Sequence, residues 1–520
     1  MVNRARRSGS RARADDALTV RVSGGRVRGV RESTTLAWKG IPYAAPPVGP
    51  LRFRAPQPVV AWRGVRDCSR FGDIAQQSIR RLLPLADPIP MSEDCLSVNV
   101  RTPAGHATAS SRLPVMVFIH GGGYSTGSSR DFSGQGEGFA GSGRVVYVSF
   151  NYRLGPFGYL DFRRYSTRAH RFDGNLGLRD QAAALRWVRA NIRAFGGDPR
   201  RVTVFGESAG GNAITTLMAT PSARGLFARA IAQSPPPNAV YEATTTGAWA
   251  AEFVESLRTI RPSDVDDATL LAHARAADLL EAAETLQIRT PDRYPGEFCF
   301  APVVDGGFLP VHPLVAFRSG YTRKIPVIIG TNAREGSIFR GRIDILPRSP
   351  RRIAALFDRA PAQARDPMRA AYPGLPAPRA AADFGGDYGF WYPSIRFADL
   401  QARRGPVFAY RFDVAPRLLK IVGLDATHGV EMFALFDRLE EPLARAMTSL
   451  GGAEAYAAAG GRMRERWLRF AESGEPGSDW PAYDEGERLT LVIDEADRIE
   501  SDPHRERRMA WEAFLPSLGG

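Results

Sequence analysis

Residues 202–211 read VTVFGESAGG, and the setting of Ser208 in this stretch decides the fold. The run Val202–Phe205 is β-branched and aromatic, which is typical of a strand buried on both faces. Residues 209–220 read AGGNAITTLMAT and can form a helix, so Ser208 falls in a strand–turn–helix bend. Gly206 and Gly210 leave room where the two backbones nearly touch. We expect the bend to expose the serine hydroxyl at a helix N-terminus.

The pattern Gly-x-Ser-x-Gly occurs a second time, as GYSTG at residues 123–127. This copy also follows a strand-like run, VMVFIHGG at 115–122. The residues after Ser125 read TGSSRDFSGQGEG and do not favour a helix. We therefore expect Ser208 to be a nucleophile and Ser125 to belong to a loop.

A serine nucleophile needs hydrogen-bond donors for the oxyanion and a base for its proton. Residues 120–123 read HGGG directly after the strand-like run. A glycine-rich loop there can turn its backbone N–H groups toward Ser208. The N–H of Ala209 would add a further donor.

Four of the seven histidines follow Ser208, where hydrolases with this serine turn place the base. His273 lies in a helical run, and His504 lies in the charged stretch SDPHRERR, typical of the surface. The remaining candidate besides His428 is His312. His428, in DATHGVEMF, follows a strand and a loop, and we predict it to be the base.

The acid partner has two candidates. Glu335, in GTNAREGS, follows the strand-like run Val327–Ile329 and is expected at the carboxyl edge of the sheet, where ligands collect in α/β folds. Asp305, in FAPVVDGGFLP, is the alternative.

Short apolar runs separated by helical stretches continue along the chain and predict an α/β fold with a large, mostly parallel sheet flanked by helices. The runs are Val115–His120, Val145–Tyr152, Val202–Phe205, Ala230–Gln233, Val327–Gly330, Val407–Phe412 and Leu489–Ile493. Residues 18–30 predict a β-hairpin, and 36–58 a proline-rich irregular connection. Asp180–Phe195 predicts an amphipathic helix. Residues 244–290 and 340–400 are expected to be helical, cap-like insertions.

The chain has 520 residues, of which 44% are hydrophobic, and a formal net charge of +14. We expect one catalytic domain over 18–515, preceded by a disordered basic tail over 1–17. The arginines are dispersed and no nucleic-acid module is apparent, which argues against a nucleic-acid partner. No apolar run is long enough for a membrane span. The first residues lack the apolar stretch of a secretory signal, which favours a cytoplasmic location over an extracellular one.

These segments together resemble the type-B carboxylesterase family, which includes cholinesterases and bacterial para-nitrobenzyl esterases. The resemblance covers roughly residues 18 to 515. Its segments are KGIPYAAPPVGPLRFRAPQP, SEDCLSVNV, HGGG, NYRLGPFGYL, GNLGLRDQAAALRWV, FGGDP, GESAGG, FAPVVDG, GTNAREG and THGVEMF. The resemblance implies the α/β-hydrolase fold and ester hydrolysis through an acyl-enzyme, with no cofactor and no metal.

The resemblance also implies roles for individual residues. It assigns Ser208 as nucleophile, His428 as base and Glu335, rather than Asp305, as acid. It implies that the oxyanion donors are Gly122, Gly123 and Ala209. It also implies a disulfide between Cys68 and Cys95. A structural ion-pair cluster of the family is matched by Arg52, Glu93 and Arg153.

Two departures from the family bear on the substrate. The chain reads QSPPPN at 233–238 where the family usually reads QSG, beside the acyl pocket. Between Cys68 and Cys95 it lacks the tryptophan that holds the choline of cholinesterase substrates. That loop carries the basic residues Arg70, Arg80 and Arg81. It also carries the apolar residues Leu82, Leu83, Leu85 and Ile89.

We therefore predict a carboxylesterase acting on neutral, fairly apolar small-molecule esters, as a monomer or weak homodimer. The alternatives are a non-catalytic binding protein on the same scaffold, and an amidase, thioesterase or acyltransferase that uses the same triad.

Overall fold

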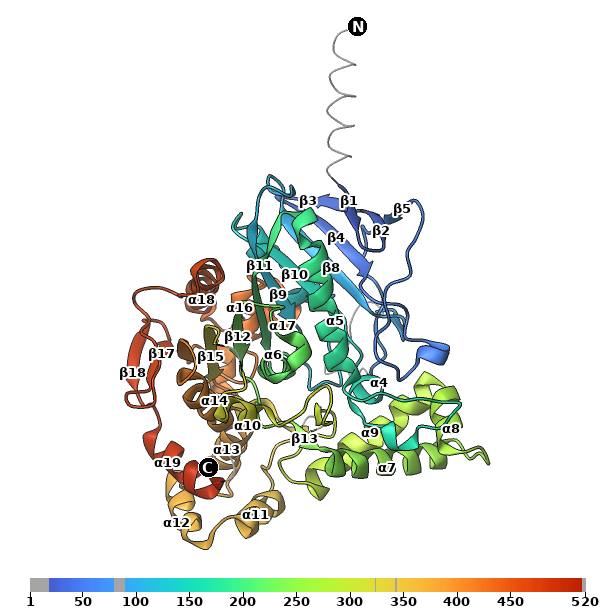
Figure 1. The fold of residues 1–520 in the computed structure, drawn as a ribbon. Helices are drawn as coiled ribbons and strands as arrows, with labels where there is room; N and C mark the ends of the chain where they lie inside the picture. The colour runs from blue at the N-terminus through green and yellow to red at the C-terminus, as the bar shows by residue number, and fades with distance from the viewer. Residues whose placement is uncertain (1–17, 79–88, 323, 342–343, 517–520) are drawn as a thin grey trace.

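The computed structural model describes residues 18–78, 89–322, 324–341 and 344–516 (Figure 1). Within them an 11-stranded sheet forms the centre of the fold. Its middle strands run parallel, as the alternation of strands and helices predicts. In spatial order they are β10 (Val146–Phe150), β9 (Leu113–Ile119), β11 (Gly197–Glu207), β12 (Arg229–Gln233), β15 (Val327–Asn332), β16 (Val407–Phe412) and β17 (Leu489–Ile493).

Antiparallel strands complete both edges of the sheet. They are β8 (Ser97–Pro103), β4 (Thr35–Pro42) and β3 (Val30–Glu32) on one side and β18 (Arg498–Ser501) on the other. The prediction of an irregular connection over 36–58 is therefore wrong at its start. Residues 35–38 of β4 are fully buried, and their backbone groups are paired with those of β8. The prolines that follow lack an N–H and could not pair in this way.

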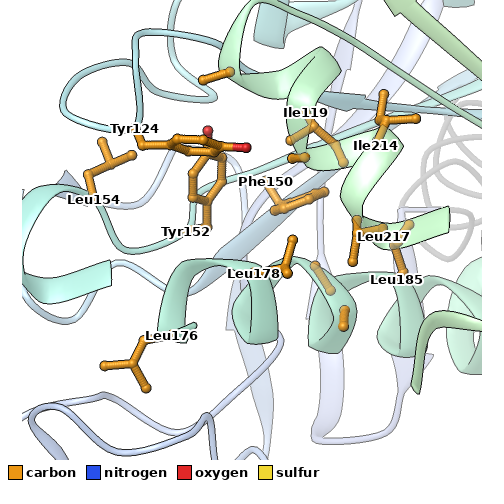
Figure 2. Packing of buried hydrophobic residues seen from close by; sticks show 14 of the residues in the cluster. Ile119, Tyr124, Phe150, Tyr152, Leu154, Leu176, Leu178, Leu185, Ile214 and Leu217 are labelled. Atoms are coloured by element: carbon orange, nitrogen blue, oxygen red, sulfur yellow. The ribbon is translucent and has the colours of Figure 1, made fainter. Parts of the chain in front are cut away.

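The alternation of side chains along β9 shows how both faces of the sheet are covered. Val115, Val117 and Ile119 pack into one core with α5 (Leu176–Asn191) and α6 (Ala209–Ala219), as Figure 2 shows for Ile119. Met116 and Phe118 point into a second core with α16 (Glu431–Leu435) and α18 (Ala453–Ser473). Burial on both faces explains why these strands read as continuous apolar runs.

Helix α5 differs from its predicted bounds at both ends. It begins at Leu176 rather than Asp180, and after Asn191 the chain tightens into a 3₁₀ turn, Ile192–Phe195. Gly196 then ends the helix with φ 90°, a left-handed conformation suited to glycine. The predicted hairpin is confirmed, because β1 (Thr19–Val22) pairs antiparallel with β2 (Gly25–Arg28).

Two groups of helices follow the carboxyl ends of β12 and β15, and Figure 1 shows most of them beyond the same end of the sheet. After β12 come α7 (Ala243–Ile260), α8 (Asp267–His273) and α9 (Ala276–Arg293). After β15 come α11 (Pro350–Arg359), α12 (Ala362–Ala371), α13 (Pro378–Gly386), the π-turn η7 (Asp387–Trp391) and α14 (Tyr392–Ala402). The basic tail predicted over 1–17 lies outside the described residues.

Candidate active site

Ser208 lies in the bend between β11 and α6, with φ 58° and ψ −123°. Residues other than glycine rarely adopt this backbone conformation. The turn is held by a hydrogen bond from the Ser208 N–H to the Gln233 carbonyl, 2.9 Å. The flanking glycines are sterically required. A Cβ on Gly206 or Gly210 would lie 2.5 Å or 2.0 Å from the Ile119 carbonyl oxygen.

The glycine loop after β9 approaches this turn from the neighbouring strand. A Cβ added at Gly121 would lie 3.2 Å from the Ser208 Cβ. Gly122 and Gly123 have φ 103° and 59°, which only glycine adopts without strain. Among the described residues, no acceptor binds the backbone N–H groups of Gly122, Gly123 or Ala209. These donors are free for a ligand, as the prediction of an oxyanion hole requires.

Ser125 lies on the same loop, as expected from its sequence. Its hydroxyl donates to the Gly122 carbonyl, 3.2 Å, and accepts from the Gln287 side chain of α9, 3.2 Å. No helix begins at Ser125, so the strand–turn–helix geometry belongs to Ser208 alone among these two serines.

His428 and Glu335 are in direct contact. His428 Nδ1 lies 2.5 Å from Glu335 Oε2. The other carboxylate oxygen of Glu335 accepts from the Ser234 hydroxyl and the Asn332 N–H, both at 2.6 Å. Glu335 follows β15 at the carboxyl edge of the sheet, and its side chain is fully buried.

Asp305 is engaged elsewhere. Its carboxylate accepts from Asn175 Nδ2, 3.0 Å, and from the backbone N–H groups of Gly307 and Leu309, 3.0 and 2.8 Å. Of the two acid candidates, the geometry therefore brings Glu335 and not Asp305 to His428.

Sequence reasoning missed a second carboxylate beside the histidine. Glu207 Oε1 lies 3.1 Å from His428 Nε2. In this structure the Ser208 hydroxyl has no hydrogen-bond partner among the described residues, and the His428 ring nitrogen faces Glu207 instead. The hydrogen bond between a catalytic serine and its base is often long before substrate binds and shortens when it does. The signal was available, since Glu207 stands directly before Ser208 in the motif.

A third carboxylate, Glu431, lies behind this pair. It accepts from Asn332 Nδ2, 2.6 Å, and from Gln233 Nε2, 3.1 Å. Burial alone would lower the pKa of His428, but the surrounding carboxylates Glu207, Glu335 and Glu431 outweigh it and raise that pKa. Burial raises the pKa of Glu207, and the imidazole of His428 opposes that rise.

Aromatic rings flank His428 on its apolar side. The ring centroids of Phe390 and Phe339 lie 4.3 Å and 5.3 Å from that of the imidazole. Both belong to an apolar cluster with Phe298, Ile338, Ile345 and Leu346. A group bound on this side of His428 would therefore meet hydrocarbon, whereas Glu207 lies on the Nε2 side.

Cys68 and Cys95 are free, buried thiols in this structure, so the disulfide stays a prediction. Burial raises the pKa of the Cys68 thiol to about 12 and also raises that of Cys95. Thiolates carry out disulfide exchange, so these thiols are poorly reactive.

The predicted ion-pair cluster is divided in two. Arg52 binds Glu93, with Nε 2.7 Å from Oε2. Arg153 instead pairs with Asp180 through two hydrogen bonds of 2.8 and 2.7 Å. Residues Arg80, Arg81, Leu82, Leu83 and Leu85 of the neighbouring loop lie outside the described residues.

Comparison with known proteins places this chain in a family. The sequence model of the Carboxylesterase family matches residues 16–359. The para-nitrobenzyl esterase of Bacillus subtilis is 37% identical over 501 residues, which cover 95% of this chain and 98% of that protein. The chain belongs to the carboxylesterase family.

Further similar proteins are also named as esterases. A cocaine esterase of Oryctolagus cuniculus is 34% identical, covering 92% of this chain and 91% of its own. A solved structure of a PNB esterase superposes with a TM-score of 0.84 at 36% identity, covering 95% of this chain and 99% of its own.

The protein is thus a carboxylesterase with the α/β-hydrolase fold. Carboxylesterases hydrolyse small-molecule esters. Within the described residues, no helix is both long and apolar enough to span the bilayer, and no group of three or more His, Cys, Asp or Glu side chains could hold a metal ion.

Proposed function

We propose that this carboxylesterase hydrolyses neutral, fairly apolar esters, with Ser208 as nucleophile, His428 as general base and Glu335 as the acid that orients His428. The observation that most strongly supports this proposal is the 2.5 Å contact between His428 Nδ1 and Glu335 Oε2 beside the strained Ser208 turn. Glu335 accepts three hydrogen bonds, which suits a carboxylate. Because Glu335 holds Nδ1 of His428, the nitrogen that would exchange a proton with substrate groups is Nε2, which faces Glu207.

The mechanism follows from these positions. His428 Nε2 takes the Ser208 proton as Oγ attacks the ester carbonyl carbon. The oxyanion accepts hydrogen bonds from the N–H groups of Gly122, Gly123 and Ala209, and removing one such donor typically costs about 3 kcal/mol in the transition state. His428 then protonates the leaving alcohol. Water deprotonated by the same imidazole releases the acid from the acyl-enzyme.

On one side of His428, two aromatic rings suit an apolar substrate group, while the carboxylate of Glu207 lies on the Nε2 side. Phe339 and Phe390 line the imidazole, and burial of an aromatic or alkyl group against them contributes roughly 25 cal/mol per Å². The one aromatic residue of the 69–78 segment, Phe71, already carries the Lys39 ammonium over its ring, 4.8 Å from the centroid. One face of this ring is therefore already taken by a cation, and the Lys39 charge would repel a second one.

The test compares benzyl butyrate with butyrylcholine, which share an acyl group and differ in the alcohol. We expect kcat/KM to be at least about tenfold higher for the benzyl ester, or about 1.4 kcal/mol in transition-state binding. Equal values, or a preference for the choline ester, would contradict the proposed substrate class.

A further inference from the structure

Asn212 connects three parts of the site that the sequence keeps apart. It lies one turn after Ser208 on α6, and its N–H donates to the Ser208 carbonyl, 2.9 Å. Its side chain is fully buried. Oδ1 accepts from the Tyr124 hydroxyl, 2.5 Å, and Nδ2 donates to the Pro236 carbonyl, 2.6 Å. Since a carbonyl can only accept, the Pro236 bond fixes which way the amide points.

The Tyr124 bond holds the end of the glycine loop. Tyr124 directly follows Gly123 and has φ 57°, a conformation that a tyrosine adopts only when it is held there. Its ring stacks on Tyr159 with centroids 4.0 Å apart, and Figure 2 shows it beside Tyr152. The hydroxyl bond to Asn212 therefore ties the loop that carries Gly122 and Gly123 to the helix that carries Ser208.

The Pro236 bond holds the segment that departs from the family pattern. Prolines 235–237 have no N–H to donate, so this segment can be fixed only through its carbonyl groups. The Pro235 carbonyl accepts from the Ser394 hydroxyl of α14, 3.1 Å, and the Pro236 carbonyl accepts from Asn212. The preceding residue, Ser234, bonds Glu335. The wall beside the triad is thus anchored to the nucleophile helix by one amide.

We propose that Asn212 is a positioning residue that sets the distance between the Ser208 turn, the oxyanion loop and the Pro235–Asn238 wall. The inference rests on the proposed serine mechanism. Replacement by an apolar residue would leave the buried Tyr124 hydroxyl unpaired and would remove one of the two donors to the Pro236 carbonyl, which also accepts from the Ala239 N–H, 2.9 Å. The tyrosine and the wall would then shift to regain hydrogen bonds. A misplacement of about 1 Å in an active site can lower turnover on the order of 100-fold.

The experiment compares Asn212→Leu, Tyr124→Phe and the double variant, using p-nitrophenyl acetate and butyrate. Asn191→Leu is the matched control. Asn191 is also buried on a helix and also makes both side-chain bonds, to Ser23 and to the Trp187 carbonyl, but it lies outside the site. For each variant kcat, KM and Tm are measured.

We expect Asn212→Leu to lower kcat at least about tenfold while KM changes less than about threefold, because the loss is in the transition state. Asn191→Leu should lower Tm by a similar amount and leave kcat within about twofold. Tyr124→Phe should lower kcat about threefold, and the double variant should be no slower than Asn212→Leu, since both changes break the same bond.

The proposal is overturned if Asn212→Leu keeps kcat within about twofold of the wild type, or if the two losses in the double variant multiply. Should Asn212→Leu not fold, Tyr124→Phe decides, since it removes one oxygen atom and keeps the stacked ring. Wild-type turnover and its loss in Ser208→Ala test the proposed function separately from the ratio between variants.

Discussion

At the scale of single residues, the negative charges around His428 have the largest effect on the chemistry of the site. A general base must be neutral to accept a proton, whereas the carboxylates of Glu207, Glu335 and Glu431 stabilise the imidazolium and raise the pKa of His428. The same charges stabilise the imidazolium that forms in the transition state. Glu207 is the one that faces Nε2, the atom that exchanges the proton.

Glu207→Gln should shift the acid limb of the pH profile of kcat/KM to lower pH, by about one unit. The sign follows from the charge: a neutral amide does not stabilise the imidazolium, so His428 loses its proton at a lower pH and becomes a competent base there. The control is Glu465→Gln, which removes a carboxylate from a surface pair with Arg144. An unchanged limb, or one moved to higher pH, would show that Glu207 does not act on His428.

At the scale of elements, a buried ion pair joins the chain after β10 to helix α5. Arg153 and Asp180 are 3% and 0% exposed, and their two bonds are bidentate. A third donor, Arg153 Nη1, binds the Arg54 carbonyl, 2.8 Å. Removal of one partner would leave the other charge buried and unpaired, which is far more costly than loss of a surface pair.

Asp180→Asn should therefore lower the free energy of unfolding by about 3–5 kcal/mol, measured by denaturant unfolding. Asp366→Asn is the matched control, because Asp366 and Arg369 form an exposed pair on α12 whose loss should cost less than about 1 kcal/mol. Equal effects of the two substitutions would show that the buried pair does not stabilise the fold.

The elements that sequence could predict are those whose pattern reflects burial on both faces. Each predicted strand of the parallel region is present, because a continuous apolar run has few other solutions. Strand β4 was missed because prolines follow it closely and its partner β8 lies far along the chain. Helix α5 began earlier than predicted, since Leu176 and Gly177 are fixed by packing that the sequence alone does not reveal.

At the scale of the molecule, the parallel sheet brings together residues separated by more than two hundred positions in sequence. Ser208 follows β11, Glu335 follows β15, and His428 lies in the segment between β16 and α16. The settings of Ser208 and His428 are recognisable in the sequence, whereas the sequence left Glu335 and Asp305 both open as the acid and the family resemblance chose between them. The roles of Glu207, Ser234 and Asn212 were not predictable, since their significance lies in the contacts they make across different elements.

Activity of Ser208→Ala beside Ser125→Ala, on p-nitrophenyl butyrate, tests the central claim most directly, because both serines stand in the same sequence pattern and close to the same loop. Ser208→Ala should lower kcat by about 10³-fold or more with Tm unchanged, and Ser125→Ala should keep activity within about tenfold of the wild type. An inactive Ser125→Ala together with an active Ser208→Ala would contradict the account.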